Sequence, residues 1–162
     1  MICAAFMLTG IYFAKQAKRV FFLLERLSEL FSAFGFAAAA GGKDINNMCK
    51  EICMLDKFGC FAFIDVFVAS FYDGCDLCAM WCKCVEEAKE LSCLKNDERE
   101  ALKSFSQVFL SSGIDEFCDT CSKFSEKFAL WAAQAHESSL KNQKILVSGS
   151  FLAAAAFFII AF

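Results

Sequence analysis

The cysteines are the residues most able to do chemistry in this chain of 162 residues, which has eleven of them. Two pairs have C-x-x-C spacing: "CDLC" contains Cys75 and Cys78, and "CDTC" contains Cys118 and Cys121. Four such thiolates can hold a zinc ion, and one pair can act as a redox dithiol. Core filling is the alternative that we favour, because the count is odd and no βαβ pattern adjoins either pair. Cys84 and Cys121 also fall on apolar helix stripes, where a free thiol behaves as a small hydrophobe.

The remaining residues give no sign of a catalytic site. His136 is the only histidine, so we do not expect a nucleophile–base pair or a His-rich metal site. The acidic runs at 86–87 and 97–100 are typical of a solvated helix face and of a helix N-terminus. The net charge is −3 and no basic stripe is present, which gives no reason to expect nucleic acid as a partner. The sequence therefore predicts a protein that is not an enzyme, with no catalytic residues, cofactor or bound metal.

The composition favours an all-α fold of about six helices. There is no proline, there are eight glycines, and β-branched runs are few. A helix from Arg19 has one apolar face and is expected to break at "GFAAAAGGKD" (35–44). Asp44 is the expected N-cap of a short helix that Gly59 ends. The apolar face consists of Val20, Leu23, Leu24, Leu27, Leu30, Phe31 and Phe34.

Further helices are expected along the rest of the chain. Residues 60–72 are almost wholly apolar, and in this context a helix is favoured over a buried strand. The next helix begins at Cys75, and Asn96 is the expected cap of the one after it. The last helix starts near Asp115. Its stripe has the heptad-like spacing that suits packing along a neighbouring helix, and it comprises Phe117, Cys121, Phe124, Phe128, Trp131 and Ala135.

The two ends of the chain are apolar. All charged residues lie between Lys15 and Lys144. Eighteen helical residues extend roughly 27 Å, close to the thickness of the hydrocarbon layer. The prediction is therefore a transmembrane segment over 1–14, a helical domain over 15–144 and a second transmembrane segment over 145–162. The basic residues flanking both segments place the middle in the cytoplasm and both termini outside, with membrane lipid as a partner.

Three stretches resemble the stage III sporulation protein AB family of spore-forming Firmicutes. "LKNDEREALKSFSQVFL" (94–110) is similar to the family's acidic helix start and the Phe-Gly step that follows it, although Ser106 stands in place of the glycine. "KNQKILVSGSFLAAAAFFIIAF" is similar to the family's last segment, and "YDGCDLCAMW" resembles a stretch in which a glycine precedes Ala-Trp. The resemblance implies a non-enzymatic part of the channel complex in the mother-cell membrane around the forespore. It also implies similarity to type II secretion platform proteins, with other channel proteins and a secretion-type ATPase of the same operon as partners.

A face for such a partner is expected on the helix that contains Trp81, Glu86 and Glu87. The alternative for Trp81 is that it fills the core. Two alternatives for the whole chain stay open at this point. One is a two-span membrane adaptor with no role in sporulation, and the other is a zinc or redox protein that uses the C-x-x-C cysteines.

Overall fold

The computed structural model describes residues 2–41, 44–72, 74–110 and 113–161, with side chains described between residues 15 and 141. Over these residues the chain is all-α, which confirms the predicted class. Six α-helices and three short 3-10 helices are described. In chain order the elements are α1 (Ile2–Gly41), α2 (Ile45–Cys53), η1 (Asp56–Phe58), α3 (Ala62–Ala69), α4 (Leu77–Glu87), η2 (Lys89–Cys93), α5 (Asn96–Ser104), η3 (Phe105–Leu110) and α6 (Ile114–Ala161).

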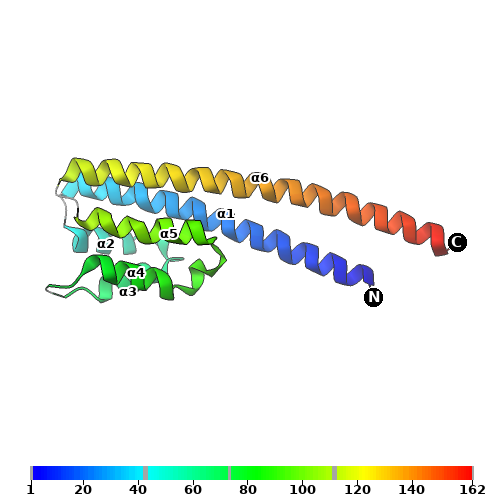
Figure 1. The fold of residues 1–162 in the computed structure, drawn as a ribbon, viewed down its shortest axis with the longest axis horizontal. Coiled ribbons are helices and arrows are strands. Elements are labelled where there is room, and N and C mark those ends of the chain that lie inside the picture. The colour runs from blue at the N-terminus through cyan, green and yellow to red at the C-terminus, as the bar shows by residue number, and fades with distance from the viewer. Residues whose placement is uncertain (1, 42–43, 73, 111–112, 162) are drawn as a thin grey trace.

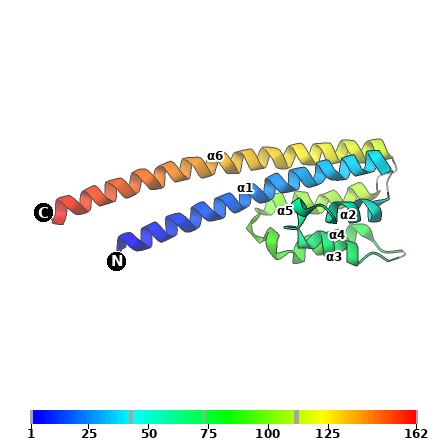
Figure 2. The same cartoon turned by 180° about the vertical axis from the view of Figure 1, so that it is seen from behind.

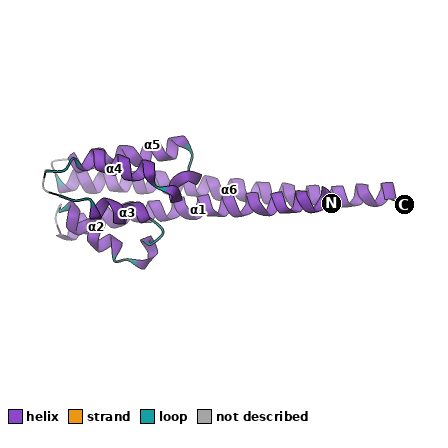
Figure 3. Cartoon of the chain, turned by 90° about the horizontal axis from the view of Figure 1, so that it is seen from below, coloured by secondary structure: helices purple, strands orange, loops and turns teal. Residues whose placement is uncertain are grey.

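Helices α1 and α6 form a long antiparallel pair that organises the fold (Figure 1). At 1.5 Å per residue, the 40 residues of α1 extend about 60 Å and the 48 residues of α6 about 72 Å. The shorter helices α2 to α5 pack beside one end of this pair. The other end projects beyond them and carries both termini (Figures 2 and 3).

Two side-chain contacts show the register of the α1–α6 pair. Ser28 Oγ donates to the carbonyl oxygen of Ser125 at 2.8 Å, in a seam where the two serine hydroxyls also lie 3.1 Å apart. About two turns away, the rings of Phe21 and His136 have their centroids 4.9 Å apart. From the first contact to the second, the residue number falls on α1 and rises on α6. This is expected for two antiparallel helices that keep one register. The register puts the exposed His136 in a packing role on the surface of the seam.

Gly35 lies at a close contact between α1 and α6, and it does not break α1. The helix continues through the alanine run to Gly41, so the first seven residues of the predicted break at 35–44 are helical. A Cβ atom built on Gly35 would lie only 3.2 Å from Cβ of Cys121. The Sγ of Cys118 donates to the carbonyl oxygen of Gly35 at 3.4 Å. The glycine therefore serves contact between two helices.

The core lies between the long pair and the short helices. The predicted apolar faces are confirmed, because the large side chains of both stripes are buried or half-buried. Phe31 of α1 is fully buried, and its ring centroid lies 4.6 Å from that of Phe105 and 5.2 Å from that of Phe128. Tilted aromatic pairs of this kind contribute about 0.5–1.5 kcal/mol beyond the area that they bury. These rings join α1, α6 and η3 in one core.

Aspartates begin two of the short helices. Oδ1 of Asp44 accepts from the backbone N–H groups of Asn46 and Asn47, which confirms the predicted cap of α2. Asp76 caps α4 in the same way. Helix α5 begins one residue before the predicted position, because Lys95 holds the N-cap position and Asn96 is already helical. These caps satisfy N–H groups that would otherwise lack partners.

The predicted membrane spans are wrong. Among the residues that the structure describes, no helix is both long and apolar enough to cross a bilayer. The described part of α1 carries Lys15 and Lys18, and that of α6 carries Glu137 and Lys141, so charges recur at close intervals. The side chains of 1–14 and almost all of those of 145–162 lie outside the described residues. The backbone of α1 and α6 continues as helix through these ranges as far as Ile2 and Ala161.

Candidate functional site

Trp81 occupies the centre of the aromatic core, so it does not lie on an exposed partner face. Its side chain is 0% exposed. Its indole Nε1 donates to the carbonyl oxygen of Leu102 at 2.8 Å, which fixes α4 against α5. Five phenylalanine rings surround it, those of Phe34, Phe63, Phe67, Phe105 and Phe109. Trp81 therefore fills the core, as the alternative interpretation held, and does not form part of an exposed partner surface.

Glu86 and Glu87 are both exposed at the C-terminal end of α4. Oε1 of Glu86 lies 2.8 Å from Nζ of Lys103, and the same ammonium group lies 2.9 Å from Oε1 of Glu100. The hydrogen bond from Lys103 lowers the pKa of Glu86 below its usual value. Glu87 has no ion pair among the described residues. A role of these two glutamates in partner binding stays a prediction, with Glu87 presenting the less compensated charge.

One C-x-x-C pair spans the start of α4, where Cys75 precedes the helix and Cys78 lies in its first turn, and the other lies on α6. The two pairs donate to different backbone carbonyls. Sγ of Cys78 donates to the oxygen of Ser106 at 3.1 Å, whereas Sγ of Cys118 donates to Gly35. Cys121 is 1% exposed and Cys75 is half-buried. In the part of the chain with described side chains, no group of three or more His, Cys, Asp or Glu residues is placed to hold a metal ion. The structure therefore does not assemble these four cysteines into the zinc site of the alternative interpretation.

Burial keeps several of the thiols protonated. It raises the pKa of Cys121 to about 12, and the neighbouring Cys118 adds to the effect. It also raises the pKa of Cys53 to about 11, where a hydrogen bond to Asp65 contributes, and it raises that of Cys49 further. A reactive cysteine needs the opposite shift, because the thiolate is the nucleophile and the metal ligand. These three thiols are packing groups at neutral pH.

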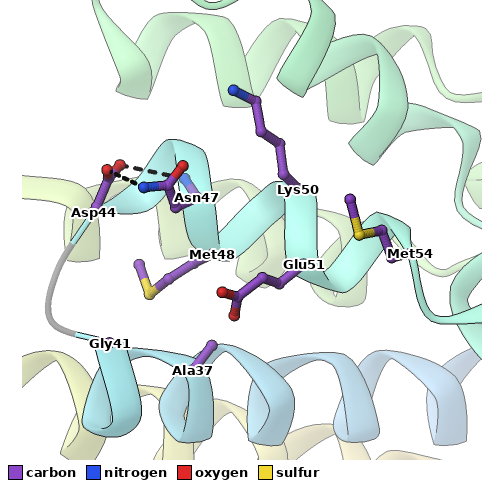
Figure 4. A pocket seen from close by; sticks show the side chains of 8 residues that line it. All are labelled: Ala37, Gly41, Asp44, Asn47, Met48, Lys50, Glu51 and Met54. Carbon is purple, nitrogen blue, oxygen red and sulfur yellow. Dashed lines mark hydrogen bonds between the residues drawn. The ribbon is translucent and has the colours of Figure 1, made fainter.

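A surface cleft lies where α2 turns back against the end of α1 (Figure 4). Ala37 and Gly41 of α1 form one wall, while Met48 and Glu51 of α2 and the following Met54 form the other. We call this feature the α1–α2 cleft. Its volume is about 320 Å³. The side chains of Met48 and Glu51 point toward α1, and that of Lys50 points to the opposite side of α2 (Figure 4).

Sequence reasoning did not identify the α1–α2 cleft. The alanine run was interpreted as a break, so no helix was expected to face α2. The signal that could have indicated it is the spacing of Met48, Glu51 and Met54 by three residues, which puts a carboxylate between two methionines on one helix face.

The described residues define a class of protein, an all-α bundle organised by a long antiparallel helix pair. The buried tryptophan, the protonated thiols and the ion-paired Glu86 have structural explanations, whereas Glu87 has no ion pair among the described residues. The comparisons with known proteins then give the family. The family model for stage III sporulation protein AB matches residues 1–162, so the chain belongs to the stage III sporulation protein AB family. This is a family of sporulation proteins.

The family match stands alone among the comparisons. No curated protein and no solved structure matches the chain.

Proposed function

We propose that the chain is a non-enzymatic component of the channel complex between the mother cell and the forespore. In this role it resembles a type II secretion platform protein and engages a secretion-type ATPase encoded in the same operon. The observation that carries the proposal is the family match over the full chain. The structure supports it because the described residues form a rigid helical bundle with exposed charged and apolar side chains, which suits a protein that binds other proteins.

The mechanism that we propose is one of positioning. The long α1–α6 pair holds the short helices beside the C-terminal half of α1, while the N-terminal half of α1 extends beyond them (Figure 1). A partner that binds the short helices is then held at a set distance from whatever the projecting end contacts. The exposed carboxylate of Glu87 gives the ATPase a place to bind with a basic surface.

Binding to the purified ATPase tests this proposal. The full chain and the ATPase are mixed, and the complex is measured by size-exclusion chromatography with light scattering. The expected result is a complex that Glu87→Lys weakens and that Glu126→Lys leaves unchanged. Glu126 is a matched control, since it is exposed on α6 and has no ion pair among the described residues. The absence of any complex with the unaltered chain would contradict direct engagement of the ATPase.

A further inference from the structure

We propose that the α1–α2 cleft binds an amphipathic helix of a partner protein, and that this helix places a lysine or arginine side chain against Glu51. The inference rests on the proposed function, in which the partner is another component of the sporulation complex. Three observations carry it: exposed apolar side chains beside the cleft, an uncompensated carboxylate inside it, and walls formed by two helices.

One apolar side chain that lines the cleft is the most exposed of its kind. Met54 is 81% exposed, the highest value among the large apolar side chains that the structure describes. Leu55, which follows Met54, is 43% exposed. Large apolar side chains gathered at one surface mark binding sites, and methionine adapts its shape to different partners. An apolar stripe on a partner would cover these side chains.

The charge inside the cleft selects the partner's chemistry. Glu51 points toward α1 and has no ion pair or hydrogen bond with any described side chain (Figure 4). Some other exposed glutamates have cationic neighbours, such as Glu137 with Lys141 at 2.8 Å, whereas Glu87 and Glu126 have no ion pair among the described residues. Asp44 at the rim already accepts hydrogen bonds from Asn47, and Lys50 points away from α1. Among the described side chains, the carboxylate of Glu51 therefore has no cationic partner.

Both the methylene stem and the cationic head of a lysine or arginine side chain suit this site. Its methylene stem can pack on Met54 and Ala37, and its cationic head can pair with the carboxylate of Glu51. The walls are the last turn of α1 and the exposed side of α2, which leave an open groove between two helices. An amphipathic helix is the element that fills such a groove with anchors three and four residues apart. The predicted occupant is thus a basic amphipathic helix.

Photo-crosslinking in sporulating cells tests the cleft. A photoreactive phenylalanine analogue replaces Met54 in the full chain, which is expressed in a spore former that lacks its own member of the family. A second strain carries the analogue in place of Leu130, which is 59% exposed on α6 and serves as the control. Crosslinked peptides are identified by mass spectrometry, and spore formation is scored in the same strains.

The expected result is a crosslink from position 54, and not from position 130, to a peptide of another protein with an amphipathic pattern that includes lysine or arginine. Glu51→Lys is expected to reduce its yield about tenfold or more, since like charges at an interface cost several kcal/mol. Glu126→Lys should leave the yield unchanged. Exchanging the partner's basic residue for glutamate should restore the yield with Glu51→Lys.

Other outcomes overturn the proposal. A crosslink to a second copy of the chain, a crosslink to lipid, or no crosslink from position 54 would each do so, as would a yield that Glu51→Lys does not change. Spores without the expected crosslink would reject the cleft and leave the proposed function in place. The expected crosslink without spores would reject the role in sporulation and leave the cleft in place.

Discussion

Replacement of Gly35 tests whether the α1–α6 contact sets the packing of the bundle. Gly35→Leu adds a side chain where a Cβ atom alone would lie 3.2 Å from Cβ of Cys121. Carbon atoms pack best at about 3.5–4.0 Å, so the two helices must separate to admit the leucine. Overpacking of this kind costs about 1–3 kcal/mol, toward the upper end for four added carbons. Replacing a glycine inside a helix with a better helix former stabilises the folded state by about 1 kcal/mol. The expected net loss of stability is about 2 kcal/mol.

Urea unfolding followed by circular dichroism at 222 nm (a wavelength that reports helix) measures this loss. The matched control is Gly149→Leu in α6, because nothing lies within 4 Å of a Cβ atom built there. The control should be neutral or slightly stabilising. The reasoning would be refuted if Gly35→Leu were as stable as the unaltered chain, because the two helices could not then be in the described contact.

Three further predictions concern the core and the thiols. Trp81→Phe should lower the free energy of unfolding by about 1–3 kcal/mol in the same assay, since Leu102 keeps a buried carbonyl with no indole donor; an unchanged value would contradict the contact. Stability should fall as pH rises from about 8.5, the ordinary cysteine value, toward the pKa of Cys121 at about 12, because the unfolded chain loses thiol protons first. Cys121→Ala should reduce that fall in urea midpoints measured at pH 7 and pH 10, and an equal fall would count against it. Purified protein should contain no stoichiometric zinc by atomic emission, and serine at the four C-x-x-C cysteines should leave function intact; one zinc ion per chain would favour the metal alternative.

Much of the fold follows from periodicity in the sequence. The stripes that begin at Val20 and Phe117 repeat every three or four residues over many turns, and such long repeats admit few other structures. The N-caps at Asp44 and Asp76 depend only on residues close by in the chain, so they can be predicted from the sequence. The sequence predicted the cap at Asp44. These features depend on neighbours within a few residues along the chain.

Features that depend on a distant partner could not be predicted in this way. Gly35 has the sequence signature of a helix breaker, and only the position of Cys121, far along the chain, shows that it serves close packing. Trp81 has an apolar stripe on one side and acids after it, so its burial depends on phenylalanines from three other segments. The carboxylate of Glu51 forms a candidate site only because α1 continues past the alanine run.

The membrane prediction had a different source of error. It rested on the absence of charge in two terminal ranges whose side chains lie outside the described residues, whereas no helix among the described residues is both long and apolar enough to cross a bilayer. Apolar composition at an end of a chain does not by itself determine what that end contacts.

Complementation is the measurement that tests the role in sporulation most directly. The gene is placed in a tractable spore former that lacks its own member of the family, the protein level is confirmed, and a late forespore-specific reporter is followed. A component of the channel complex should restore both the reporter and spores. A chain that is present at normal levels and restores neither would contradict that role.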